Sequence, residues 1–276
     1  MMPLPEPIFI DGPAGRVFAL FIRPAGEIRE TLIYLPPFAE EMNRCRATVA
    51  RQAYRLRELG CATLLVDPFG TGDSEGELAD ANWGIWLGDA EAALDWVAAR
   101  TTGGITLWGL RTGALLAAEV ANRRPREIGL LLLWQPVIDG RLFVTQTLRS
   151  RVAFLMDRGL PGETTDEMRE TLQSGSHLEV AGYLLSETLV GDLDGKKLAE
   201  LIPPGISVDW FEVVVEANRS LGPASRAAIA KISEKGCQVN ERPFLGPPIW
   251  QLHKRDEVPD LIDSTTEAVR ARHASE

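Results

Sequence analysis

The residues best placed to do chemistry lie in the segment TLWGLRTGALLA, which runs from Thr106 to Ala117. Gly109 and Gly113 flank a central Arg111 at the spacing of G-x-S-x-G, the sharp strand-to-helix turn that presents a nucleophile. The flanking residues must be small because this turn packs closely against its own strand and helix. Arg111 stands at the nucleophile position, and a guanidinium keeps its proton and cannot attack. The segment therefore predicts a turn that presents a charged side chain in place of a nucleophile.

This turn belongs to a chain in which β-rich and helical segments alternate, the pattern of a mostly parallel sheet with helices on both faces. Strands are expected over 17–23, 31–36, 61–67, 104–108, 128–134, 206–216 and from 237 onward. Helices are expected over 43–60, 83–99, from the turn to 122, 223–235 and 258–272. From 141 to 204 the pattern is helical, without a strong strand. We therefore predict an α/β core over 1–140 and 205–276, with a helical cap, or lid, inserted over 141–204.

The composition is that of a soluble globular protein, with 45% hydrophobic and 25% charged residues among 276. This balance excludes a disordered chain. The formal net charge of −10 argues against a nucleic-acid partner, because an acidic surface repels the phosphate backbone. The chain shows no membrane span, since its longest apolar stretch is far too short, and its start lacks the pattern of a signal peptide. We expect a cytoplasmic protein.

The cysteines and the glycine-rich turns give no sign of a cofactor. Cys45, Cys61 and Cys237 are odd in number, widely spaced and free of any C-x-x-C pair. This pattern supports neither a disulfide framework nor a zinc site, and it fits a reducing compartment. The stretch GTGDSEG lacks the G-K-[ST] ending of a phosphate-binding loop. We therefore expect no metal and no organic cofactor.

The alternating elements, the insertion, the turn at Arg111 and a D-x-x-G-x-G-x-S-x-G stretch from Asp67 to Gly76 resemble the α/β-hydrolase fold over nearly the whole chain. More narrowly, the segments GLRTGALLA, PPFAEEMNRCR, LLLWQPVIDGRLF and EVAGYLLS resemble the exosortase A system-associated hydrolase 2 family. That family is found beside bacterial exopolysaccharide and protein-sorting genes. The resemblance implies a hydrolase of ester or acyl substrates.

The hydrolase resemblance also implies an acid after a late strand and a histidine after the last strand. Glu216 lies about where the acid is expected, with Glu212 as an earlier alternative. A solvent-exposed strand end is an equally good interpretation of Glu216. His253 is the only histidine near the expected loop, although it comes a few residues late and an exposed loop histidine is a common alternative.

The same resemblance implies an oxyanion hole of backbone N–H groups. Pro36 and Pro37 stand in the loop that would supply one of them, and proline has no backbone donor. Phe38 and Ala39 remain as donors from this loop, together with Thr112 directly after Arg111. The hole can therefore persist without the nucleophile.

Three hypotheses follow for Arg111. It binds a carboxylate or phosphate of a small-molecule acyl or anionic ligand, in a catalytically inactive homologue whose cap selects the rest of the ligand. It stabilises a developing oxyanion while a water activated by His253 and Glu216 attacks an ester or thioester. It pairs internally with an acid such as Glu216 or Asp139, and the protein is a partner in export or sorting machinery.

Overall fold

The computed structural model describes residues 3–216, 219–251 and 257–275. An eight-stranded sheet forms its centre, in the order β1-β2-β4-β3-β5-β6-β9-β10. The strands are β1 (Glu6–Asp11), β2 (Arg16–Ile22), β3 (Glu30–Leu35), β4 (Cys61–Asp67), β5 (Gly104–Leu110), β6 (Ile128–Trp134), β9 (Ser207–Val214) and β10 (Gln238–Leu245). β2 runs antiparallel to β1 and β4, and all other pairs are parallel. The predicted mostly parallel sheet is confirmed.

The inner strands are apolar at nearly every position because the sheet is buried on both faces. Every residue of β3 is buried, as are all residues of β4 except Leu65. A strand covered on both sides needs apolar residues at every position rather than at alternate ones. This is why the continuous runs CATLLVD and IGLLLLW predict the bounds of β4 and β6 to the residue.

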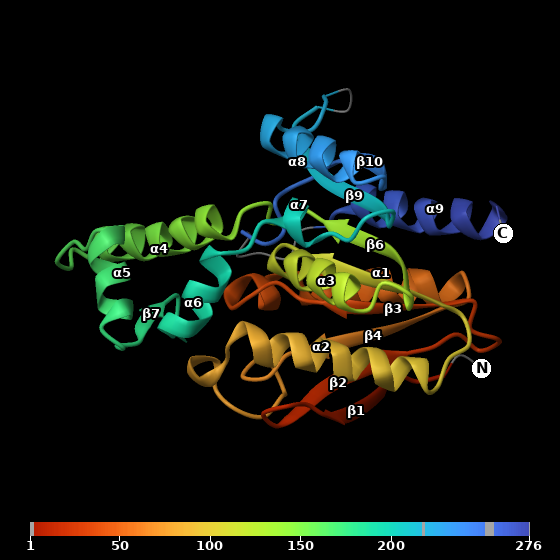
Figure 1. Ribbon diagram of the computed structural model, residues 1–276, viewed down its shortest axis with the longest axis horizontal. Helices are drawn as coiled ribbons and strands as arrows, with labels where there is room; N and C mark the ends of the chain where they lie inside the picture. Colours follow the sequence, from red (N-terminus) through yellow and green to blue (C-terminus); the bar gives the residue numbers. More distant parts are fainter. Residues whose placement is uncertain (1–2, 217–218, 252–256, 276) are drawn as a thin grey trace.

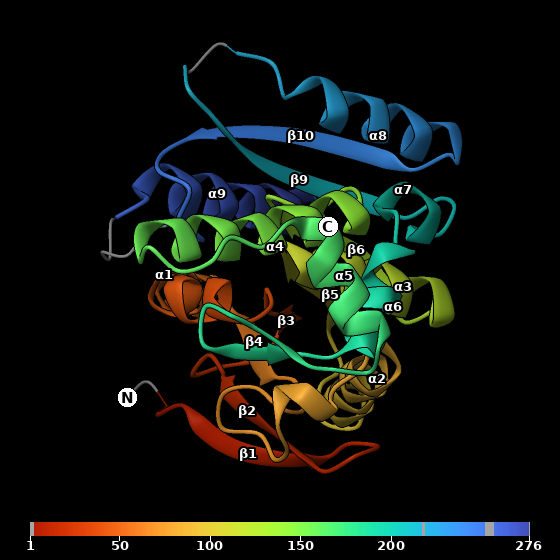
Figure 2. The same cartoon turned by 90° about the vertical axis from the view of Figure 1, so that its left-hand side faces the viewer.

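Helices cover both faces of the sheet, as predicted. They are α1 (Glu40–Glu58), α2 (Trp83–Ala98), α3 (Thr112–Arg123), α8 (Pro223–Glu234) and α9 (Pro259–Ser275), with a short 3-10 helix over Leu78–Asp80. Figure 2 shows α1 and α9 on one side of the sheet and α2, α3 and α8 on the other. Each side has its own hydrophobic core. None of the helices in the described ranges is long and apolar enough to cross a membrane.

Most of the segment between β6 and β9 lies beyond one end of the sheet, on the left of Figure 1, whereas its last helix packs against α3 and α8. It contains α4 (Gly140–Asp157), α5 (Thr165–Gln173), β7 (Leu178–Val180), β8 (Tyr183–Leu185), α6 (Glu187–Asp194) and α7 (Leu198–Leu201). The prediction of a helical pattern without strands is wrong for β7 and β8, which form an antiparallel hairpin. Ala181 and Gly182 both have positive φ, of 52° and 85°, and this is the backbone of a two-residue hairpin turn.

Candidate functional site

The tight turn at Arg111, here called the elbow, joins β5 to α3. Arg111 has a φ of 54° and a ψ of −115°, a strained conformation for a residue with a side chain. A Cβ on Gly109 would lie 2.5 Å from the Cα of Ala114, and one on Gly113 would overlap the carbonyl oxygen of Leu35. Only glycine fits at either position. The prediction of a tight turn with two obligatory small residues is confirmed.

The main chain of Arg111 is held on both sides. Its N–H donates to the carbonyl oxygen of Trp134 at 3.1 Å, and its carbonyl oxygen accepts from the N–H of Val137 at the same distance. Both partners belong to the end of β6 and the loop after it. The elbow is therefore fixed to the neighbouring strand, and this aims the Arg111 side chain in a defined direction.

The Arg111 guanidinium forms an ion pair with Glu41, in the first turn of α1. Nε donates to both carboxylate oxygens at 3.2 and 3.3 Å, and Nη2 donates to Oε1 at 3.2 Å. In the part of the chain that the structure describes, Nη1 donates to no protein group. One of the three hypotheses gave Arg111 an internal acid such as Glu216 or Asp139, and neither is the partner: Asp139 caps α4 through the N–H of Leu142, and Glu216 is exposed.

Strand order explains why Glu41 is the partner. β3 and β5 are neighbours in the sheet, so the loop that follows β3 and the elbow that follows β5 meet at the same edge. α1 begins directly after that loop and carries Glu41 into reach of Arg111. The sequence signal was the pair of acidic residues in PPFAEE, but it becomes informative only once the two strands are known to be adjacent.

Two aromatic rings flank the Arg111 guanidinium. Its central carbon lies 5.0 Å from the ring centre of Trp250 and 5.7 Å from that of Phe143. Contacts of this kind attract a cation to the face of a ring, and they also restrict its rotamers. The Arg111 side chain is only 13% exposed. The guanidinium is therefore held in place before any ligand arrives.

Arg111 lies in the wall of a cavity of about 260 Å³ between the carboxyl edge of the sheet and α4. Its apolar walls come from α4, the β7–β8 hairpin, the loop after β3 and the segment after β10: Phe38, Phe143, Val180, Ala181, Leu185 and Trp250. Its uncharged polar side chains are Gln146, Thr147, Ser150 and Gln251. Its charged side chains are Glu40, Glu41, Arg44 and Arg111. The lining thus carries two glutamates and two arginines, and the formal charges of these four side chains cancel.

The charged side chains are arranged as two pairs. Arg44 Nε donates to Glu40 Oε1 at 3.2 Å, in parallel with the pair formed by Arg111 and Glu41. Arg44 Nη1 also donates to the carbonyl oxygen of Gln251 at 2.6 Å, which ties α1 to the segment after β10. Burial raises the pKa of Glu41 above its ordinary value, although the charge of Arg111 opposes this. Glu41 therefore takes up a proton more readily than an ordinary glutamate.

The residues predicted for an oxyanion hole lie beside the elbow. Phe38 and Ala39 line the cavity. Ala39 has a φ of 52° and a ψ of −130°, close to the backbone of Arg111, so two strained residues face the same space. Thr112 is the first residue of α3, and its Oγ1 is buried without a hydrogen-bond partner among the described residues.

The predicted acid does not line the cavity, and the predicted histidine lies outside the described residues. Glu216 is exposed, two residues past the end of β9, and does not line the cavity. Glu212 is buried and accepts from Trp210 Nε1 at 3.0 Å and from the N–H of Gly222 at 3.1 Å, so it holds the loop after β9. His253 lies outside the described residues.

No family model matches the chain, and no curated protein matches its sequence. Solved structures do match. Est1E from Butyrivibrio proteoclasticus, with ferulic acid bound, has a TM-score of 0.66 at 19% identity, covering 97% of this chain and 98% of that one. The α/β hydrolase GrgF from Penicillium sp. sh18 has a TM-score of 0.62 at 17% identity, covering 99% and 97%. A serine hydrolase homologue from Coxiella burnetii has a TM-score of 0.55 at 18% identity, covering 98% of each.

The chain has the α/β-hydrolase fold. In this fold the elbow residue presents the nucleophile, and the oxyanion hole uses the N–H of the next residue and an N–H from the loop after the third strand. The sequence predicts Arg111, Thr112 and the loop of Phe38 and Ala39 for those positions. Glu41 follows this loop and brings a carboxylate to the elbow side chain. The α/β-hydrolase frame is thus present with an ion pair at its centre.

Proposed function

We propose that this protein binds a small anionic acyl ligand at Arg111 and does not cleave esters by the serine mechanism. The observation that carries the proposal is the Arg111 guanidinium itself, which is fixed at the elbow and lines the cavity. Its Nη1 donates to no protein group within the described ranges, so one side of the planar fork is available to a carboxylate.

Glu41 supports this proposal because it is a carboxylate that the same guanidinium already binds. Its contacts of 3.2 and 3.3 Å are longer than the roughly 2.7–2.9 Å of tight charge-assisted hydrogen bonds. A loose internal pair leaves Arg111 able to donate to a second acceptor. The carboxylate of a ligand would bind at Nη1 and share the cation with Glu41.

Glu41 also supplies a way to balance charge when the ligand binds. Two ionised carboxylates on one guanidinium would leave a net negative charge in a mostly buried site. Because burial raises the pKa of Glu41, this side chain is ready to take up a proton as the anion arrives. Ligand binding is therefore coupled to protonation of Glu41.

Cavity size and lining define the rest of the ligand. A volume of about 260 Å³ is just below the roughly 300–1,000 Å³ of pockets for drug-sized molecules. Phe143, which flanks Arg111, and Val180 and Leu185 of the β7–β8 hairpin give the cavity apolar walls. These features suit a carboxylate on a short or medium acyl chain, such as octanoate. The exosortase-associated resemblance extends the proposal to acyl or anionic compounds of exopolysaccharide or protein export.

Hydrolysis without an elbow serine is the second candidate, and one observation favours it. Trp250 and Gln251 line the cavity, and His253 follows two positions later in the chain. In this alternative His253 activates a water, and Arg111 stabilises the oxyanion. Glu216, the acid predicted for this mechanism, is exposed and does not line the cavity.

Two measurements on the purified protein separate these candidates. The first is turnover of a panel of short and medium acyl esters and thioesters, with His253→Ala alongside to exclude a contaminating esterase. The second is the thermal shift produced by matched carboxylates in the wild type, in Arg111→Met and in Arg149→Met, which removes an exposed arginine of α4 outside the cavity. We expect no turnover, and a shift that Arg111→Met alone abolishes. Turnover that His253→Ala removes would support the hydrolase instead.

A further inference from the structure

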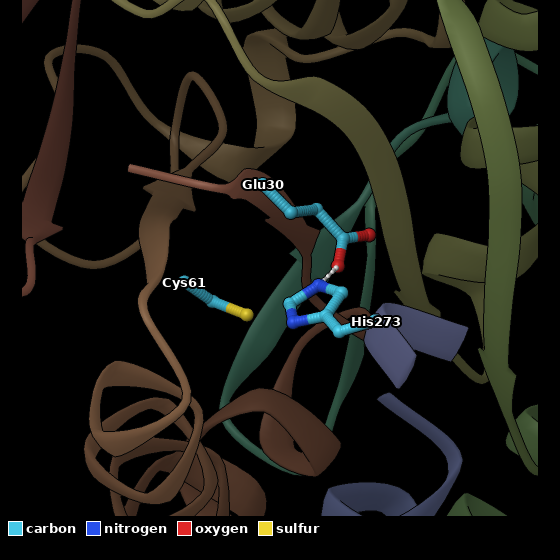
Figure 3. A group of neighbouring side chains, drawn as sticks. All are labelled: Glu30, Cys61 and His273. Atoms are coloured by element: carbon cyan, nitrogen blue, oxygen red, sulfur yellow. Dashed lines mark hydrogen bonds and ion pairs between the residues drawn. The ribbon is translucent and has the colours of Figure 1, made fainter. Parts of the chain in front are cut away.

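A second group of chemically reactive side chains lies at the opposite edge of the sheet from the cavity. Glu30 is the first residue of β3, Cys61 is the first residue of β4, and His273 lies in the last turn of α9. One ligand atom from each lies within 4.8 Å of the other two. Figure 3 shows the three side chains pointing toward one another. β4 alone separates the two edges by roughly 20 Å, so this group is independent of the function proposed for Arg111.

His273 has one nitrogen in use and one without a partner. Nε2 lies 3.0 Å from Glu30 Oε2, while Nδ1 is buried and has no hydrogen-bond partner within the described ranges. The side chain is only 6% exposed. In Figure 3, this unpartnered nitrogen lies on the side of the ring that faces the sulfur of Cys61. A hydrogen on Nδ1 would be a buried donor without an acceptor, so we assign the hydrogen to Nε2 and a lone pair to Nδ1.

Glu30 fixes that assignment because it is an ionised acceptor. Arg272 Nη2 donates to its two oxygens at 2.7 and 2.8 Å, and Thr106 also donates to Oε1 at 2.5 Å. Burial opposes ionisation, but the hydrogen bond with His273 and the charge of Arg272 together hold the pKa of Glu30 below its usual value. A carboxylate that accepts from the far nitrogen of a histidine is the usual outer partner of a metal-binding imidazole.

Charged side chains of both signs surround this group. Arg272 Nη1 lies 3.3 Å from Asp209 Oδ2, and Arg242 Nε lies 3.1 Å from Asp209 Oδ1. Two carboxylates, Glu30 and Asp209, thus face two guanidinium groups. The sulfur of Cys61 is buried and forms no disulfide, so Cys61 and the Nδ1 of His273 offer two metal ligands. A thiolate is a ligand that selects Cu(I), whereas structural Zn²⁺ takes four ligands.

We propose that Cys61 Sγ and His273 Nδ1 bind a soft monovalent metal ion, Cu(I), in a two-coordinate site, with Glu30 as the residue that positions the imidazole. Thiolate and imidazole are both donors that copper accepts. Bonds as long as those of zinc, roughly 2.0 Å to nitrogen and 2.3 Å to sulfur, would span about 4.3 Å in a straight line, which lies within the 4.8 Å that bounds the ligand atoms of the group. Binding forms the bonds from Cys61 and His273 to copper, releases the thiol hydrogen as H⁺, and changes no oxidation state.

An anaerobic Cu(I) titration against a chromophoric competing chelator tests the site. The background is the Cys45→Ser/Cys237→Ser double variant, which removes the other two free thiols of the chain. We expect one Cu(I) per chain, with one proton released, and no comparable binding of Zn²⁺. Cys61→Ser or His273→Gln should each weaken binding at least as much as Glu30→Gln, for which loss of an outer partner predicts about 10–100-fold. Unchanged affinity in either ligand variant would overturn the proposal.

X-ray absorption of the copper-loaded wild type keeps the test decisive if a buried variant fails to fold. The expected spectrum has one sulfur and one nitrogen in a two-coordinate Cu(I) site. A spectrum of sulfur ligands alone, or the absence of tight Cu(I) binding by the folded wild type, would contradict the assignment. Zn²⁺ bound as tightly as Cu(I) would contradict the two-ligand site that selects Cu(I).

Discussion

The guanidinium of Arg111 and the carboxylate of Glu41 form an ion pair at 3.2 Å in the wall of the cavity, with side chains 13% and 21% exposed. The pair joins the elbow after β5 to the start of α1, two segments that are 70 residues apart. It places a cation at the elbow, where the sequence predicts the nucleophile position of the α/β-hydrolase fold. The functional account therefore depends on what this pair does to stability and to ligand binding.

Arg111→Met should destabilise the protein by leaving the Glu41 carboxylate unpaired. Loss of one partner from a fully buried pair costs about 3–5 kcal/mol, and the residual exposure of both side chains reduces this to about 1–3 kcal/mol. Urea unfolding measures the difference. The double variant Arg111→Met/Glu41→Leu should recover most of the loss, because it leaves no isolated charge. Equal destabilisation in the single and double variants would show that the pair does not act as a unit.

Glu41→Gln should bind octanoate more tightly than the wild type and lose the pH dependence of binding. Ligand binding requires a proton on Glu41, so wild-type affinity should fall as the pH rises through the raised pKa of this residue, by up to about tenfold per pH unit. The glutamine needs no proton, so its affinity should stay flat above the pKa of the ligand. Calorimetry in buffers of different ionisation enthalpy measures the proton uptake directly, and its absence in the wild type would contradict the coupling.

Gly113→Ala should prevent the elbow from forming, because its Cβ would overlap the carbonyl oxygen of Leu35, which is backbone and cannot move aside. We expect a loss of about 3 kcal/mol or more, in the range of severe core substitutions. Gly129→Ala in β6 is the matched control, since its Cβ would meet nothing nearer than 3.9 Å. Thermal and urea unfolding compare the two variants, and similar stabilities would disprove the close packing at Gly113.

Asp89 should make stability depend on pH. Its Oδ2 accepts from the N–H of Phe69 at 2.8 Å, its Oδ1 is buried without a partner among the described residues, and burial raises its pKa to about 6. A carboxyl whose pKa is raised on folding favours the folded state below its unfolded pKa of roughly 4, and loses that contribution as the pH rises through 6. Asp89→Asn should therefore gain up to about 3 kcal/mol relative to the wild type between roughly pH 4 and 8. A constant difference would exclude Asp89 as the titrating group.

Local patterns predicted most of the fold because each depends on a few neighbouring residues. The apolar run at Cys61–Asp67 requires a strand buried on both faces, and the glycines beside Arg111 require a tight turn. The β7–β8 hairpin was not predicted because its strands are only three residues long. Its turn is formed by Ala181 and Gly182, of which only the glycine is a typical turn residue.

The partners of the key side chains could not be predicted from local patterns, because these partners depend on which strands are adjacent in the sheet. Glu41 reaches Arg111 only because β3 lies beside β5. Cys61 and His273 lie close together for a similar reason. The packing of α9 against α1 brings the end of the last helix to the start of β4. Spacing along the chain gave no sign of that group, since Cys61 has no neighbouring cysteine or histidine in the sequence.

Calorimetric titration with octanoate, with octan-1-ol as the uncharged control, tests the binding role of Arg111 most directly. A hydrogen bond to a charged group contributes about 1.5–3 kcal/mol, so Arg111→Met should weaken octanoate binding by roughly 10–150-fold while the alcohol binds both proteins alike. Arg149→Met should match the wild type for both compounds. Equal octanoate affinity in the wild type and Arg111→Met would contradict the proposal that the elbow arginine binds an anion.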